Sequence, residues 1–173
     1  MQMERRASLE LRAKGRRLEG YAALYGVETR IADFTEIVLP GAFTGTLNER
    51  RDILALVDHD PKAVLARTRS GTLRLSEDSR GLAFDLDVPE TGAGRDVLAL
   101  AERGDLGGMS FGFSVPDAGE RWTGDRRELR NIVLHEISVV SAHPAYDGTV
   151  VQARRRVVLP PRLAVAKRFL ETV

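Results

Sequence analysis

Short segments with β-type sequence, separated by turns that contain Gly or Pro, run through most of this chain. Residues 7–12 alternate apolar and polar side chains, and the pattern resumes over 15–25, so a hairpin is predicted there. Helical spacing is clear only over 94–103, which Gly104 follows, and 41–50 are compatible with one short helix. The pattern predicts a mostly β fold with a few helices (α+β), a barrel or a sandwich. Further strands are expected at 34–39, 53–57, 63–68, 72–77, 82–88, 106–115 and 131–142.

Composition excludes several kinds of function. The chain has 173 residues, enough for one domain with a core, and 43% of them are hydrophobic. It has no cysteine, which rules out disulfides, thiolate zinc sites and cysteine nucleophiles. With 26 basic and 25 acidic residues the net charge is +1, so no nucleic-acid role is expected. The N-terminus is charged and no apolar run approaches the roughly 20 residues that span a bilayer, so we expect an intracellular protein without a membrane role.

The C-terminal region differs in composition from the rest of the chain. Three successive arginines at 154–156 are followed by adjacent prolines, Pro160 and Pro161. Adjacent prolines interrupt regular structure. We therefore divide the chain into a domain over 1–155 and a basic, Pro-containing tail over 156–173.

Residues 108–112 read GMSFG and match the G-x-S-x-G pattern of serine hydrolases. The residues that follow continue a strand and do not begin a helix, so this is not the strand–turn–helix elbow of α/β-hydrolases. In a strand, Met109, Phe111 and Phe113 would point into the core and Ser110 would point to the other face. A glycine two residues away on each side would leave an open surface for a substrate backbone. The alternative is a surface serine in a glycine-rich strand.

His59 follows an apolar strand and stands between Asp58 and Asp60. A histidine at the end of a rigid strand is well placed to act as a general base. The alternative is a histidine in a solvated turn without a function. Side-chain alternation would turn both aspartates away from His59, so no metal site is predicted.

Residues 134–145 read LHEISVVSAHPA, an apolar strand that contains two titratable groups. A buried carboxylate is costly without a partner. Glu136 or His135 must therefore find one, either an imidazole or an arginine such as Arg103 or Arg121.

Four segments occur in the chain in this order: PGAF at 40–43, His59-Asp60, GMSFGF at 108–113 and the strand at 134–145. Together they resemble the tailed-phage prohead serine protease family, which is similar in fold to the herpesvirus capsid maturation proteases (assemblins). The resemblance covers about residues 5–155 and implies a single partly closed β-barrel with peripheral helices. It also implies the catalytic order His, Ser, third residue, with His59 as general base, Ser110 as nucleophile and Glu136 as the third member. His143 is the rival for that third position and His135 a weaker one. Backbone N–H groups near 142–146 would bind the oxyanion.

The resemblance also implies an activity and a location. The expected protein is a serine endopeptidase that needs no cofactor or metal. It would cleave the scaffold segment of the major capsid protein, and itself, inside the prohead of a tailed phage or gene-transfer particle, in the host cytoplasm. Whether it forms a homo-oligomer is left open. The alternative is a catalytically silent β-barrel that serves as a scaffold or assembly protein of the same particle.

Overall fold

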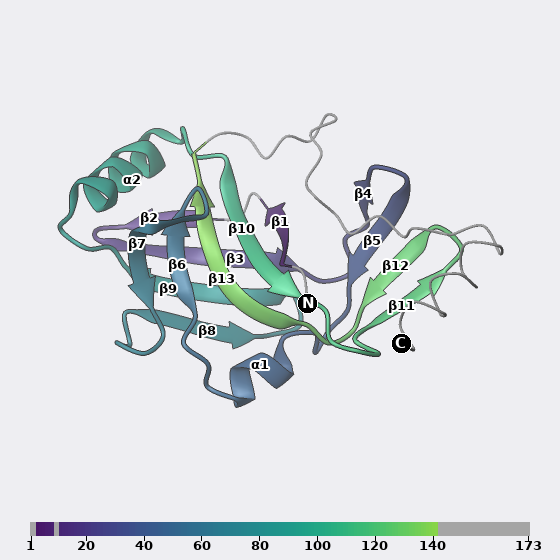
Figure 1. Cartoon of the computed structure of the whole chain (residues 1–173). Coiled ribbons are helices and arrows are strands. Elements are labelled where there is room, and N and C mark those ends of the chain that lie inside the picture. Colours follow the sequence, from purple (N-terminus) through teal and green to yellow (C-terminus); the bar gives the residue numbers. More distant parts are fainter. Residues whose placement is uncertain (1–2, 9–10, 142–173) are drawn as a thin grey trace, which may run out of the picture.

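Strands form most of the ordered structure. The computed structural model describes residues 3–8 and 11–141. A five-stranded sheet lies in front in Figure 1, a four-stranded rear sheet lies behind it, and a four-stranded side sheet extends to the right. In spatial order the five-stranded sheet contains β1 (Glu4–Ser8), β10 (Gly108–Ser114), β13 (Val133–Val140), β6 (Leu54–Val57) and β7 (Asp60–Arg67). The rear sheet contains β2 (Leu11–Lys14), β3 (Arg17–Leu24), β9 (Gly81–Asp87) and β8 (Leu73–Glu77). The side sheet contains β11 (Glu120–Thr123), β12 (Arg126–Leu129), β5 (Phe34–Val38) and β4 (Thr29–Ile31).

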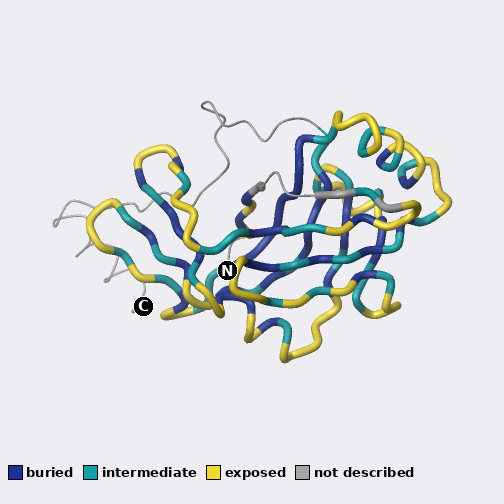
Figure 2. Tube along the Cα trace, turned by 180° about the vertical axis from the view of Figure 1, so that it is seen from behind, coloured by how far each residue is buried: buried dark blue, intermediate teal, exposed yellow. Residues whose placement is uncertain are grey.

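The hydrophobic core lies between the five-stranded sheet and the rear sheet. Both sheets turn one apolar face inward, and the buried stretches are concentrated in these strands (Figure 2). Burial of these side chains is the main favourable contribution to folding. The five-stranded sheet contributes Ala55, Leu65, Met109, Phe111, Phe113, Ile137 and Val139, and the rear sheet contributes Leu18, Leu73, Leu82, Phe84 and Leu86.

The mostly β, α+β prediction is confirmed, but the partly closed barrel is not. Within the described part of the chain, none of the three sheets closes on itself. In the five-stranded sheet β1 pairs only with β10 and β7 only with β6, so the ladder ends at both edges. The packing of two open sheets corresponds to the sandwich alternative.

Both predicted helices are present. Helix α2 (Gly92–Arg103) begins at Thr91, whose hydroxyl accepts a hydrogen bond from the Gly94 N–H at 3.2 Å. It ends at Gly104, whose φ of 74° is the left-handed conformation that glycine adopts easily. Helix α1 (Thr44–Asn48) is one short turn after the PGAF segment, whose Phe43 is fully buried against Tyr25 and Phe111. Among the described residues no helix has the length and apolar character to cross a membrane.

A buried ion-pair network attaches β1 to the side sheet. Arg127 of β12 donates to both carboxylate oxygens of Glu4 and to Glu36, with distances of 2.9 Å to Glu36 and 2.8 Å to Glu4 Oε1. Arg6 binds Glu36 with two nitrogens and Glu4 at 3.1 Å. All four side chains are at most 7% exposed. Because each charge has partners of opposite sign, burial of the group is tolerated.

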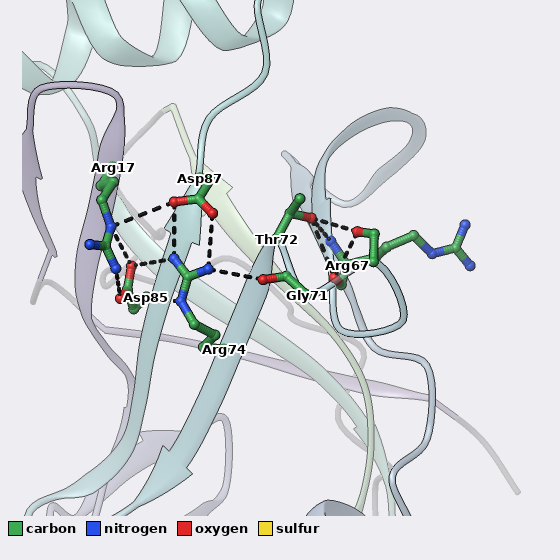
Figure 3. A network of polar contacts seen from close by, with 8 residues as sticks. Arg17, Arg67, Gly71, Thr72, Arg74, Asp85 and Asp87 are labelled. Atoms are coloured by element: carbon green, nitrogen blue, oxygen red, sulfur yellow. Dashed lines mark hydrogen bonds and ion pairs between the residues drawn. The ribbon is translucent and has the colours of Figure 1, made fainter.

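A second, exposed network crosses the outer surface of the rear sheet (Figure 3). Arg74 of β8 contacts Asp85 and Asp87 of β9, each at 2.9 Å, and Arg17 of β3 contacts Asp85 from the other side. Exposed pairs of this kind add little to stability. Their regular placement marks this face as the solvent side of the rear sheet.

Candidate active site

Strand β10 places Ser110 on the outer face of the five-stranded sheet. Met109, Phe111 and Phe113 are at most 3% exposed and belong to the core, as the alternation predicted. Ser110 lies on the opposite face, between Ala7 of β1 and Ser138 of β13 in the ladder. Its side chain is nevertheless only 3% exposed.

Strand β13 places Glu136 and Ser138 on the same outer face. Ser138 is the register partner of Ser110, and side chains directly opposite in an antiparallel pair lie side by side. The ladder shifts between Gly112 and Phe113, which pair with Glu136 and Leu134 and leave His135 as an extra residue. This bulge turns Leu134 into the core, although simple alternation would have placed it on the side of Glu136.

His59 occupies a tight turn between β6 and β7. Val57 and Asp60 pair, so Asp58 and His59 form a two-residue connection. Both have positive φ, 49° and 61°, as a type I′ hairpin turn requires. This region is sparsely populated by residues other than glycine, and strain of this kind concentrates at functional sites.

The turn brings His59 to Glu136. The distance from His59 Nδ1 to Glu136 Oε1 is 2.7 Å, and Ser138 Oγ donates to the other carboxylate oxygen, Oε2, at 2.6 Å. The carboxylate is 6% exposed, the imidazole is 16% exposed, and Ser138 is fully buried. Among the described residues, Arg5 of β1 forms the recorded ion pair with this carboxylate, with its Nε 3.9 Å from Glu136 Oε1. The carboxylate therefore fixes Nδ1 as the protonated ring nitrogen, and Nε2 is left to exchange a proton.

Gly112 makes room for that carboxylate. A Cβ built at Gly112 would lie 2.3 Å from Glu136 Oε1 and 3.0 Å from its Cδ. The second glycine of the GMSFG segment was expected to leave an open surface for a substrate backbone. In the structure the side chain of Glu136 fills this space. The expectation of an open surface is therefore wrong for Gly112.

Ser110 and His59 share one face of the sheet. Ser110 is the register partner of Ser138. The Ser138 hydroxyl is hydrogen-bonded to the Glu136 carboxylate, and this carboxylate is hydrogen-bonded to His59. Strand β13 lies between the strand of Ser110 and the strand that leads into His59, so the backbones of these two residues are separated by two strand spacings, roughly 10 Å. Although both residues are described, the structure records no hydrogen bond between them. A catalytic contact that forms only with substrate is common in free enzymes.

Neither Arg103 nor Arg121, the arginines named as possible partners of Glu136, is recorded in contact with it, and the arginine that does contact it is Arg5. Arg103 binds Asp105 at 2.6 Å, and the contacts recorded for the Glu136 carboxylate within the described chain come from His59, Ser138 and Arg5. His143, residues 142–146 and the tail lie outside the described residues.

His135 forms a separate pair with Ser114. The distance from Ser114 Oγ to His135 Nε2 is 2.6 Å. Burial and the nearby charge of Arg51 lower the pKa of His135, although Glu136 opposes this. A neutral imidazole with a lowered pKa is a weak base, so this pair is a poor catalytic candidate.

The described residues offer no place for a metal ion. Among them, no three His, Asp or Glu side chains are grouped as ligands. The aspartates beside His59 bind the protein itself: Asp58 accepts hydrogen bonds from Ser141, and Asp60 accepts one from the Lys62 N–H at 2.9 Å.

Comparison with known families agrees with this arrangement. A sequence model of the caudovirus prohead serine protease family matches residues 2–160, which is most of the chain. The chain belongs to this family. No curated protein and no solved structure matches it significantly. Membership in the prohead protease family supports a serine peptidase that acts in capsid maturation, within the procapsid in the host cytoplasm. The matched region extends past residue 155, where the tail was predicted to begin.

Sequence reasoning missed the part that two residues play in this candidate site. Ser138 lies two residues after Glu136, so strand alternation alone would have placed both on one face. The role of Gly112 depends on the pairing of β10 with β13, which no local pattern reveals.

Proposed function

We propose that this protein is a serine endopeptidase with Ser110 as nucleophile, His59 as general base and Glu136 as the residue that orients the base. The observation that carries the proposal is the 2.7 Å bond between His59 and Glu136, formed on the sheet face that also carries Ser110. His59 and Glu136, which are 77 positions apart in the chain, are in contact on that face, and this supports the pairing of base and orienting carboxylate that a catalytic triad needs.

The mechanism follows from the roles of these groups. As Ser110 Oγ bonds to the carbonyl carbon of a peptide, its proton passes to His59 Nε2. The imidazolium then gives this proton to the leaving nitrogen as the C–N bond breaks. Water, deprotonated by His59, hydrolyses the acyl-enzyme and restores Ser110. Glu136 stabilises the imidazolium in both halves of the cycle.

The substrate that best fits the family is the scaffold segment of the major capsid protein, cut inside the assembled precursor shell. The protease would also cut itself. Both the phage and the gene-transfer particle are settings in which such a shell forms.

Covalent labelling tests the nucleophile without knowledge of the substrate. A fluorophosphonate accepts Ser110 Oγ at phosphorus, fluoride leaves, and the serine proton passes to His59. Intact-mass measurement should show one adduct on the wild-type protein and none on Ser110→Ala. Labelling that persists in Ser110→Ala, or maps to Ser114, would contradict the assignment. Absence of any adduct would favour the catalytically silent scaffold protein.

Co-expression with the capsid protein tests the substrate. Mass spectrometry should show a shortened capsid N-terminus with the wild-type enzyme and a full-length one with Ser110→Ala. The same comparison on the purified enzyme detects self-cleavage, because a shorter enzyme should arise only when the serine is intact.

A further inference from the structure

The turn that carries His59 is attached to the end of β13 through Asp58. The Asp58 N–H donates to the Val139 carbonyl at 2.9 Å. The Asp58 carboxylate accepts from the Ser141 N–H at 2.8 Å and from the Ser141 hydroxyl at 2.7 Å. Both carboxylate oxygens are therefore engaged, and the strand that they hold is the strand that carries Glu136.

The other side of the turn is held less regularly. Leu56 pairs with Val64 while Val57 pairs with Asp60, so three residues of β7 have no counterpart on β6. A bulge of this size interrupts the ladder and leaves the local direction of the chain poorly determined by β7. Contacts to β13 must supply the missing constraint, and those contacts are made by Asp58.

We propose that Asp58 is a positioning residue: its carboxylate holds the turn against the end of β13, so that the His59 imidazole stays in reach of Glu136. This inference rests on the proposed function of His59. Asp58 touches neither the imidazole nor the nucleophile in the recorded contacts, and it acts through the backbone of the turn.

Asp60, on the other side of His59, offers a matched control. It has the same side chain and the same separation from His59 in sequence. Its recorded side-chain contact is with the backbone N–H of Lys62, two residues along the same strand. A carboxylate here does not connect the turn to β13.

The experiment compares substitutions at the two aspartates in the full-length chain. Asp58→Gly keeps the positive φ of the turn and removes both acceptors, and Asp58→Asn keeps one acceptor oxygen. The readout is the second-order rate constant for fluorophosphonate labelling of Ser110, measured across pH. We expect Asp58→Gly to label about tenfold more slowly, since two hydrogen bonds are lost. Asp58→Asn should be intermediate, and Asp60→Asn should stay within about twofold of wild type.

The pH profile separates positioning from a merely structural role. If the imidazole drifts from Glu136, the general base loses the carboxylate that orients it, and the shape of the plot of labelling rate against pH should change. A loss of folded protein alone would lower the amount of adduct without changing the shape of this plot.

Three results would overturn the inference. They are a labelling rate within about twofold of wild type for Asp58→Gly, an equal loss of rate for Asp60→Asn, and a slower rate for Asp58→Gly whose pH profile keeps the wild-type shape. Failure of the proposed function has a different signature, because labelling would then survive in Ser110→Ala or be absent from the wild-type protein itself.

Discussion

The carboxylate of Glu136 lies in the space that a side chain at Gly112 would fill. The nearest approach of a Cβ there would be 2.3 Å to Oε1, the oxygen bonded to His59 Nδ1. The glycine of β10 and the carboxylate of β13 face each other in the ladder, so neither can change without affecting the other. The glycine thus leaves the space that Glu136, the third member of the proposed triad, occupies.

Gly112→Ala should impair catalysis far more than it impairs folding. The clash falls mainly on the far end of a flexible side chain, so Glu136 can swing away at a cost of about 1–3 kcal/mol in stability. His59 then loses its orienting bond, and labelling of Ser110 should slow about 100-fold or more. Thermal unfolding and labelling rates measure the two effects. Gly92→Ala, where a Cβ meets nothing within 4 Å, is the matched control. Equal rates for both variants would show that the Glu136 contact is not needed.

Glu136→Gln should leave the fold intact and slow turnover about 10³–10⁴-fold, because an amide no longer stabilises the imidazolium or selects its tautomer. Capsid-protein cleavage by purified variants is the measurement. His135→Ala and His143→Ala should remain close to wild type. If Glu136→Gln were fully active and His143→Ala inactive, His143 and not Glu136 would be the third catalytic residue.

Ser138→Ala should reduce the labelling rate by about tenfold. The Ser138 hydroxyl is fully buried and donates to Glu136 Oε2 at 2.6 Å, and its loss leaves one carboxylate oxygen without that donor. A hydrogen bond to a charged group is worth about 1.5–3 kcal/mol, which sets this scale. Ser114→Ala is the control, since it removes a buried hydroxyl bonded to His135 on the same pair of strands. Ser114→Ala as slow as Ser138→Ala would point to general loosening of β10 and β13.

Glu4→Gln should destabilise the protein by about 3 kcal/mol at neutral pH, since it removes one charge from a buried ion-pair network. Burial raises the pKa of Glu4, but the hydrogen bond and charge of Arg127, together with Arg6, outweigh it and hold the pKa below its ordinary value of 4.5. The stabilisation is therefore fully present above pH 4.5 and is lost as the pH falls through the lower folded-state pKa.

Chemical denaturation of wild type and Glu4→Gln between pH 7 and pH 3 would measure this difference. The difference in free energy of unfolding between wild type and Glu4→Gln should be constant above about pH 5 and should become smaller below it. Arg74→Ala in the exposed network of the rear sheet should cost only about 0–1 kcal/mol. A gap for Glu4→Gln that does not change with pH would show that the loss comes from packing and not from charge.

Local pattern was sufficient for much of the fold. Alternation and apolar runs located most of the strands, although β4 was not expected and the expected strand at 7–12 is divided between β1 and β2. Alternation also placed Met109, Phe111 and Phe113 in the core, because side chains of a strand point to opposite faces whatever the rest of the chain does. Helical spacing over 94–103 and the following Gly104 predicted α2, which in the structure begins two residues earlier, after the cap at Thr91. Resemblance in four short segments was enough to indicate the family.

Tertiary structure decided what the sequence left open. Glu136 had an imidazole or an arginine as candidate partners, and the parallel pairing of β13 with β6 brought it to the turn that carries His59. The same pairing joined Asp58 to Ser141, which alternation along one strand does not reveal. Sheet closure was also undetermined, because β1 and β7 have strand patterns whether or not another strand pairs with their free edges. Each of these outcomes depends on contacts between residues far apart in the chain, and such contacts depend on strand order and register, which side-chain periodicity does not specify.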